Sequence, residues 1–154
     1  LTMQIEIRPV AESDHDEWLR LFNLYLVFCK AYLPEETKEF TFRRLLDPAI
    51  PMWSALAIHP ETKKPIGLAN YLQHLATWST EDMIYLNDLY VDEKQRLKNV
   101  GKQLIEYVYK KADELGAPVV YWSTDFDNHR AQLLYTKVGV RTNKVKYFRS
   151  PETY

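Results

Sequence analysis

The sequence predicts a mixed α/β fold. Short segments alternate apolar and polar residues with the period of a strand, and segments with the period of a helix lie between them. No internal repeat and no linker divides the chain, which has 154 residues, 46% of them apolar. That length can bury one hydrophobic core, so we expect a single domain over residues 3–154. Leu1 and Thr2, ahead of Met3, are interpreted as residues left from expression.

A first strand is predicted over residues 5–8, where apolar and polar residues alternate up to Pro9. A helix follows, which Ser13 or Asp14 can cap. Its apolar residues recur at intervals of three and four, which is the spacing of one helix face. They are Trp18, Leu21, Phe22, Tyr25 and Phe28.

A second helix is predicted from Pro34 to Asp47-Pro48. Glu35 and Glu36 fall in its first turn, where the helix dipole favours negative charge. Its apolar positions are Phe40, Phe42 and Leu45.

Three strands are predicted next, over residues 52–58, 66–75 and 83–91. Turn-forming residues at 60–64 separate the first two, so these should form an antiparallel hairpin.

The last third of the chain returns to alternating helices and strands. A helix is predicted over residues 100–115, where Gly116 ends it, and a strand over 119–124. A helix over 128–137 and a final strand over 144–149, where apolar and polar residues alternate again, complete the order β-α-α-β-β-β-α-β-α-β.

Composition argues against several classes of protein. The net charge of −1 lacks the basic excess that nucleic acids or anionic membranes usually require. Cys29 is the only cysteine, so no intramolecular disulfide can form, and it lies in an apolar stretch, 24–29, that is typical of a helix core. The histidines have no ligand-like spacing, so we expect no metal. With no signal-peptide pattern, we expect a cytoplasmic protein, with the nucleus as an alternative.

The segment from Asp88 to Lys102 is the most informative part of the chain. A strand gives way there to a helix through a basic, polar turn. The N–H groups at a helix start and the positive dipole end attract phosphate, and Gly101 lets the backbone approach a ligand closely. Lys98 and Lys102 add positive charge. The alternative is an ordinary strand-to-helix loop with solvated lysines, and the glycine patterns of P-loop and dinucleotide-binding proteins are missing.

Two motifs give the chain a family resemblance. Arg96-Leu97-Lys98-Asn99-Val100-Gly101 is similar to Gln/Arg-x-x-Gly-x-Gly/Ala, the phosphate loop of the GNAT superfamily, but carries Asn99 where that family usually has glycine. Asparagine tolerates a left-handed backbone better than most residues. Residues 128–139 resemble the second signature of the superfamily, an Asn and an Ala leading to Leu-Tyr and then Gly.

The resemblance extends over nearly the whole chain. Blocks at 87–91, 120–122, 124–125 and 128–135 carry it. It is closest to small fungal enzymes described as histone and other protein acetyltransferases and as D-amino-acid N-acetyltransferases. A weaker likeness to spermidine/spermine acetyltransferases includes an acidic residue at the position of Asp88.

This resemblance implies the GNAT (acyl-CoA N-acyltransferase) fold, a mixed, mostly antiparallel central sheet flanked by helices. It implies transfer of acetyl from acetyl-CoA to a primary amine of a small molecule, either an amino acid, including the D form, or a polyamine. The alternatives are a histone or protein lysine N-acetyltransferase, a non-catalytic coenzyme A sensor, and a purely structural domain. Relatives commonly pair through edge strands, which implies a homodimer or tetramer with residues 144–149 as a candidate contact.

The resemblance also implies two catalytic residues. Asp88 is the candidate base or water-relay residue, and its alternative role is a structural or substrate-orienting carboxylate. A base matters most for lysine-like amines, of which only about one in 2,500 is neutral at pH 7. Tyr135 is the candidate general acid for the leaving thiolate, and its alternative role is a core aromatic residue.

The remaining implied residues bind the coenzyme. The N–H of Leu89 should polarise the thioester carbonyl, and Val91 should pair with the pantetheine arm as a strand would. The full candidate set is Leu89, Tyr90, Val91, Arg96, Leu97, Lys98, Asn99, Val100, Gly101, Lys102, Asn128, Arg130 and Tyr135.

Overall fold

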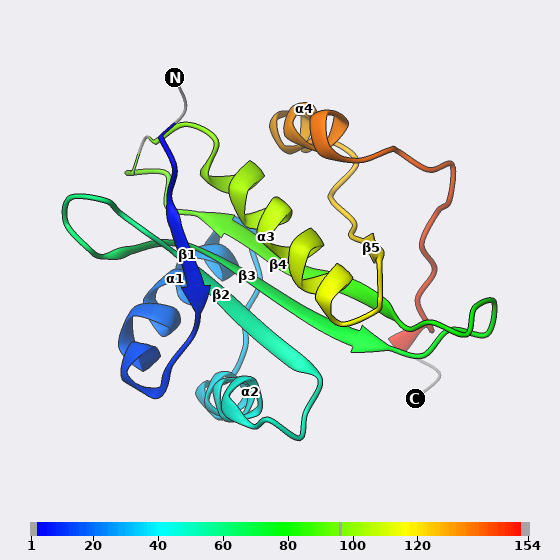
Figure 1. Cartoon of the computed structure of the whole chain (residues 1–154), viewed down its shortest axis with the longest axis horizontal. Coiled ribbons are helices and arrows are strands. Elements are labelled where there is room, and N and C mark those ends of the chain that lie inside the picture. Colours follow the sequence, from blue (N-terminus) through cyan, green and yellow to red (C-terminus); the bar gives the residue numbers. More distant parts are fainter. Residues whose placement is uncertain (1–2, 96, 152–154) are drawn as a thin grey trace. The chain divides into compact units, whose positions relative to one another are not determined.

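A five-stranded sheet forms the centre of the fold (Figure 1). Its strands run in the order of the sequence: β1 (Glu6–Pro9), β2 (Met52–Ile58), β3 (Pro65–His74), β4 (Met83–Val91) and β5 (Val119–Tyr121). The first four pair antiparallel and β4 pairs with β5 in parallel. This computed structural model describes residues 3–95 and 97–151. The predicted mixed, mostly antiparallel sheet is confirmed.

Helices cover both faces of the sheet. Leu68 of β3 belongs to the core cluster that includes Trp18 and Leu21 of α1 (His15–Phe28) and Phe42 of α2 (Glu35–Leu46). A Cβ atom on its neighbour Gly67 would instead lie 3.2 Å from Leu104 of α3 (Val100–Glu114). Successive side chains of a strand point to opposite faces. Therefore α1 and α2 lie on one face and α3 on the other.

The start of α1 is fixed by Asp14, after a short 3-10 turn over Glu12–Asp14. Its carboxylate accepts hydrogen bonds from the Ala11 N–H at 2.8 Å and from both terminal nitrogens of Arg8 at 2.7 and 2.8 Å. The Arg8 hydrogen bond, with smaller help from that of Ala11, holds the pKa of Asp14 below its usual value. Asp14 therefore occupies the N-cap position of α1, as predicted, but its side chain makes no capping hydrogen bond to the helix and instead joins the helix start to Arg8 of β1.

Three predictions about buried apolar positions were wrong. Phe28 is 52% exposed and Phe40 is 51% exposed. Cys29 lies just beyond α1, at its C-cap, and is exposed rather than part of a helix core. Phe28 lies at the margin of the buried face of α1, whereas Phe40, two residues from the buried Phe42, lies on the opposite side of α2.

The bounds of α3 are close to those predicted, whereas β5 is half as long as predicted. Gly116, which follows α3, has φ +69°, a left-handed conformation that glycine adopts without strain. β5 ends at Tyr121, three residues before the predicted end at 124.

The chain groups into two units, Leu1–Ser123 and Thr124–Tyr154, and the second contains α4 (His129–Val138). The predicted strand over 144–149 was wrong, because the described residues there form no ladder. Val145, Tyr147 and Phe148 are exposed. Alternation alone does not make a strand without a partner. In the part of the chain that the structure describes, no helix has the length and apolarity needed to cross a bilayer.

Candidate active site

The edge of β4 that faces β5 is open over much of its length. β5 pairs with β4 only from Met83 to Tyr85. From Leu86 to Val91, that edge has no strand partner among the described residues. Backbone N–H and C=O groups in this stretch can therefore serve a ligand that binds as an extra strand.

The direction of these backbone groups follows from one hydrogen bond. The N–H of Asp92 donates to the carbonyl of Ile66 at 2.8 Å, so it faces β3. Backbone groups alternate between the two edges along a strand. The backbone N–H and C=O groups of Tyr90 and Asp88 therefore also face β3. Those of Leu89 and Val91 face the open edge. This is the orientation that the predicted roles of Leu89 and Val91 require.

A β-bulge at Asn87 aims the side chain of Asp88. Asn70 of β3 pairs with Asp88, but the next residue, Tyr71, pairs with Leu86, which leaves Asn87 as the extra residue. Without the bulge, Leu86 and Asp88 would share a face of the sheet. The extra residue puts Asp88 on the opposite face, beside Asn70 and α1.

Asp88 is partly buried, and its carboxylate is held by side-chain donors from three elements. Asn70 donates to Oδ2 at 3.1 Å and Asn87 to Oδ1 at 3.4 Å, and the Tyr25 hydroxyl of α1 also donates to it. Burial raises the pKa of Asp88 above its usual value, and the hydrogen bonds from Asn70, Tyr25 and Asn87 oppose that rise. Burial thus makes Asp88 a stronger base than an exposed carboxylate.

Asp92 anchors the loop that follows β4. It is buried, and its Oδ1 accepts from the N–H of Lys94 at 3.0 Å, which forms a tight turn. Its Oδ2 accepts from Arg20 of α1 at 3.2 Å, and Arg20 also donates to the carbonyl of Pro65 at 2.8 Å. Arg96 lies outside the described residues, so its predicted contact with phosphate stays a prediction.

Helix α3 begins immediately after a left-handed residue. Asn99 is its N-cap, with φ +63°, and its side chain does not cap the helix. Asparagine thus adopts a conformation that glycine adopts easily, as its place in the motif predicts. The first-turn N–H groups of a helix have no partner within it, and those of Gly101 and Lys102 lie in that turn. Their binding of phosphate stays a prediction.

Side chains near this helix start play different parts. Val100 is buried in the core and Leu97 is partly buried, so the backbone is what these two can offer a ligand. Lys98 is exposed, and Lys102 lies 3.7 Å from Glu106 one turn further along α3.

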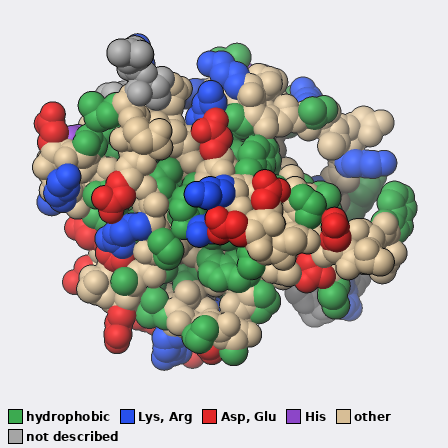
Figure 2. All heavy atoms as spheres, in the orientation of Figure 1, with side chains coloured by type: hydrophobic (Ala, Val, Ile, Leu, Met, Phe, Trp, Pro, Cys, Tyr) green, Lys and Arg blue, Asp and Glu red, His purple; other side chains and the backbone are tan. Residues whose placement is uncertain are grey.

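Tyr90 packs its ring towards Tyr25 and Phe28 of α1. Over the face shown in Figure 2, cationic and anionic side chains are intermixed.

The second unit carries three of the predicted site residues on or beside α4. Asn128 caps this helix, because its Oδ1 accepts from the N–H of Ala131 at 3.2 Å. Arg130 is exposed and Tyr135 is partly buried. Burial raises the pKa of the Tyr135 phenol, which keeps it protonated at neutral pH, as a general acid must be. The catalytic and coenzyme contacts of these residues stay predictions.

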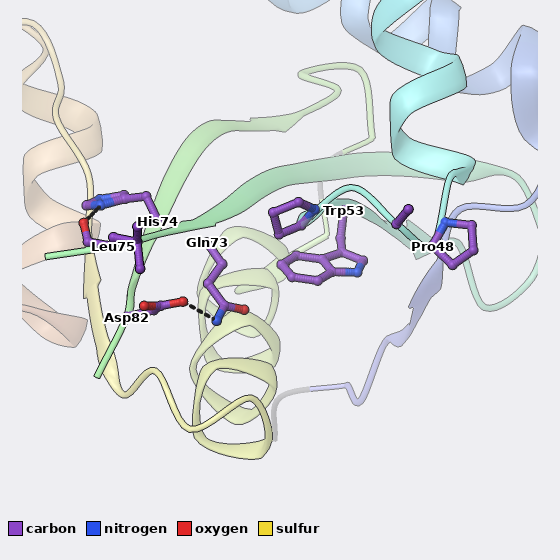
Figure 3. A pocket seen from close by; sticks show the side chains of 8 residues that line it. Pro48, Trp53, Gln73, His74, Leu75 and Asp82 are labelled. Atoms are coloured by element: carbon purple, nitrogen blue, oxygen red, sulfur yellow. Dashed lines mark hydrogen bonds between the residues drawn. The ribbon is translucent and has the colours of Figure 1, made fainter. Parts of the chain in front are cut away.

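A shallow, open hollow of about 510 Å³ lies at the other end of β3 (Figure 3). Trp53, Pro48 and His74 line it, together with Gln73, whose side-chain amide donates to Asp82 at 2.8 Å. The hollow lies near His74, at the end of β3. The loop that leads to α3 follows Val91, which pairs with Gly67 near the start of β3, and Asn70 lies between the two places. We therefore do not assign acetyl transfer to the hollow. No three His, Cys, Asp or Glu side chains among residues 3–95 and 97–151 gather as metal ligands.

Sequence reasoning missed the bulge and the partners of Asp88. A signal for the bulge exists, because the apolar residues Ile84, Leu86, Leu89 and Val91 include one step of three instead of two. No local signal identifies Asn70, which reaches Asp88 only through the register of β3 with β4.

Comparisons with known proteins show which family the sequence resembles. The model of the acetyltransferase (GNAT) family matches residues 16–140. The D-amino-acid N-acetyltransferase HPA3 of Saccharomyces cerevisiae (strain ATCC 204508 / S288c) is 49% identical over 147 residues, which cover 96% of this chain and 91% of that protein.

Solved structures share the fold. The crystal structure of a probable acetyltransferase has a TM-score of 0.81 and 26% identity, covering 95% of this chain and 97% of its own. The aminoglycoside N-acetyltransferase AAC(6')-Iy in complex with CoA has a TM-score of 0.81 and 18% identity, covering 96% and 95%. The family model and the yeast relative both extend over most of the sequence, and the chain therefore belongs to the acetyltransferase (GNAT) family.

Proposed function

We propose that this N-acetyltransferase transfers the acetyl group of acetyl-CoA to the amine of a D-amino acid. The open edge of β4, which presents Leu89 and Val91 beside the start of α3, is the observation that carries the use of acetyl-CoA. The acceptor class is supported by the yeast relative, whose name states D-amino-acid N-acetylation.

The coenzyme extends along β4 in this proposal. The pantetheine arm pairs with the N–H and C=O of Val91 as an additional strand would. The pyrophosphate meets the first turn of α3, where Gly101 permits close approach and Lys98 and Lys102 add charge. Arg96, Asn128 and Arg130 complete the contacts in the proposal.

The chemistry is a direct acyl transfer. The neutral amine attacks the thioester carbonyl carbon, and the oxyanion that develops accepts a hydrogen bond from the N–H of Leu89. The C–N bond forms, the C–S bond breaks, and the thiolate takes a proton from Tyr135. The amine loses its proton to Asp88, directly or through water. Exchange with solvent returns both side chains to their starting states.

A panel of acceptors tests the proposal. Thiol release from acetyl-CoA is measured with D- and L-enantiomers of several amino acids, with spermidine and with a histone-tail peptide. We expect release with the D-amino acids and much less with their L-enantiomers. Preference for spermidine or the peptide would replace the proposed acceptor. Coenzyme binding by calorimetry without release for any acceptor would indicate a coenzyme A sensor instead.

A further inference from the structure

We infer that Trp18 and Asn70 are positioning residues that fix the direction of a hydrogen bond to Asp88, so that this carboxylate always receives a donor. The indole Nε1 of Trp18 lies 3.3 Å from Oδ1 of Asn70, and Nδ2 of Asn70 lies 3.1 Å from Oδ2 of Asp88. Trp18 is fully buried and Asn70 is 5% exposed. The three side chains form a short relay from α1 across β3 to β4.

The direction of this relay follows from what each group can do. An indole N–H can only donate, so the Asn70 atom that faces it must be the carbonyl oxygen. The amide NH₂ is then left to face Asp88. If the amide flipped, its NH₂ would face the indole N–H and its oxygen would face the carboxylate. A flip therefore loses both hydrogen bonds in a buried site, where unpaired polar groups are costly.

The relay acts on Asp88 alongside other groups that face it. The titratable neighbour on α1 is Tyr25, with Cys29 beyond it, and Asn87 contributes from β4 itself. Among the contacts that lower the pKa of Asp88, that of Asn70 is the largest. Losing this donor leaves burial less opposed, so the pKa of Asp88 should rise further.

The catalytic meaning of the relay rests on the proposed function, in which Asp88 takes the proton of the amine. The hydrogen-bond direction does not depend on that role. A direct measurement of the Asp88 carboxyl can therefore be separated from a measurement of turnover.

The test uses Asn70→Leu and Trp18→Phe. The matched control is Gln73→Leu, because Gln73 lies on the same strand and also donates its amide to an aspartate, Asp82, at 2.8 Å. The Asp88 carboxyl carbon is titrated by ¹³C NMR, with its signal assigned by its absence in Asp88→Asn. The pH profile of kcat/KM is recorded for the same proteins.

We expect Asn70→Leu to raise the Asp88 midpoint by about one pH unit. Trp18→Phe should raise it less, because it frees the amide to rotate without removing it, and Gln73→Leu should leave it unchanged. The acidic limb of kcat/KM should move by the same amount as the carboxyl midpoint.

An unchanged midpoint in Asn70→Leu overturns the inference. If that variant does not fold, Trp18→Phe decides, since it keeps an aromatic ring in the core, and a wild-type midpoint there overturns the inference as well. A shifted midpoint with an unshifted rate profile supports the relay while removing Asp88 as the base of the proposed function.

Discussion

An ion pair between Arg20 and Asp92 joins α1 to the loop that begins directly after β4. The guanidinium Nη1 lies 3.2 Å from Oδ2 of Asp92, and Nη2 of the same group donates to the carbonyl of Pro65 at 2.8 Å. The Asp92 side chain is 9% exposed and that of Arg20 is 39% exposed. One side chain thus holds the start of β3 and the loop that leads to α3.

Arg20→Met should therefore loosen this loop. The change leaves the buried Asp92 carboxylate with one partner fewer, and because Arg20 is partly exposed we expect a cost of about 1–2 kcal/mol. Urea denaturation measures that cost. If the loop binds pyrophosphate, calorimetry should also show acetyl-CoA binding about fivefold weaker or more, which corresponds to about 1 kcal/mol.

Arg43→Met is the control for this prediction. Arg43 is exposed on α2, where its guanidinium lies over the ring of Phe40. Its loss should change stability by less than about 0.5 kcal/mol and leave coenzyme affinity unaltered. Equal effects of the two variants on coenzyme affinity would refute the role of Arg20 in placing the loop.

Asn99 should be replaceable by glycine but not by a β-branched residue. Its φ of +63° costs an ordinary L-residue about 1–2 kcal/mol, and glycine adopts that conformation freely. We therefore expect Asn99→Gly to keep or raise stability and to bind acetyl-CoA at least as tightly, and Asn99→Val to lose about 1–2 kcal/mol and bind it more weakly. Thermal unfolding and calorimetry measure the two effects.

Lys63 offers a matched position for the Asn99 prediction. It has φ +61° and lies in the turn between β2 and β3. Lys63→Gly should likewise keep or raise stability, without altering coenzyme binding. Weaker coenzyme binding by Asn99→Gly would show that the asparagine side chain, and not the backbone, serves the loop.

Leu89→Pro isolates one backbone N–H on the open edge of β4. Proline removes the N–H that is proposed to hold the oxyanion, but that group faces away from β3, so the ladder stays intact. Loss of one such donor typically lowers kcat by about 10²–10³. We expect a folded protein with a loss in that range, measured by thiol release.

Two neighbouring variants distinguish the N–H of Leu89 from its side chain. Leu89→Ala keeps the N–H and should retain most of the turnover. Tyr90→Pro removes an N–H that faces β3 and should destabilise the sheet instead. Similar kcat values for Leu89→Pro and Leu89→Ala would show that the N–H plays no part in catalysis.

Local patterns in the sequence predicted much of the sheet. The observed bounds Met52–Ile58 and Met83–Val91 are those predicted, because apolar alternation and turn residues define both strands locally. The strand over 144–149 failed because alternation does not supply a partner. The prediction that Phe28 is buried was wrong because helical spacing does not indicate how wide the buried face of a helix is.

The candidate site was predictable where the motif acts through the backbone. The backbone groups of Leu89 and Val91 face the open edge of β4, and Asn99 has a left-handed backbone, while the roles that the resemblance implies for them stay predictions. The link from Trp18 to Asn70 spans 52 residues and depends on how α1 crosses the sheet, so no spacing in the sequence reveals it.

Tyr135→Phe tests the proposed general acid. Removing the hydroxyl takes away the proton for the leaving thiolate, and general acids typically contribute about 10²–10⁴-fold. Because burial raises the pKa of this phenol, Tyr135 should keep its proton throughout the usual assay range and produce no basic limb in kcat below about pH 10. We expect kcat for thiol release to fall by about 10²-fold or more, with little change in the coenzyme affinity measured by calorimetry.

Tyr147→Phe is the control, since Tyr147 is 89% exposed in the same unit and should retain wild-type kcat. A kcat for Tyr135→Phe equal to that of Tyr147→Phe would assign the thiolate proton to water or to another group, and would leave Tyr135 as an aromatic packing residue of α4.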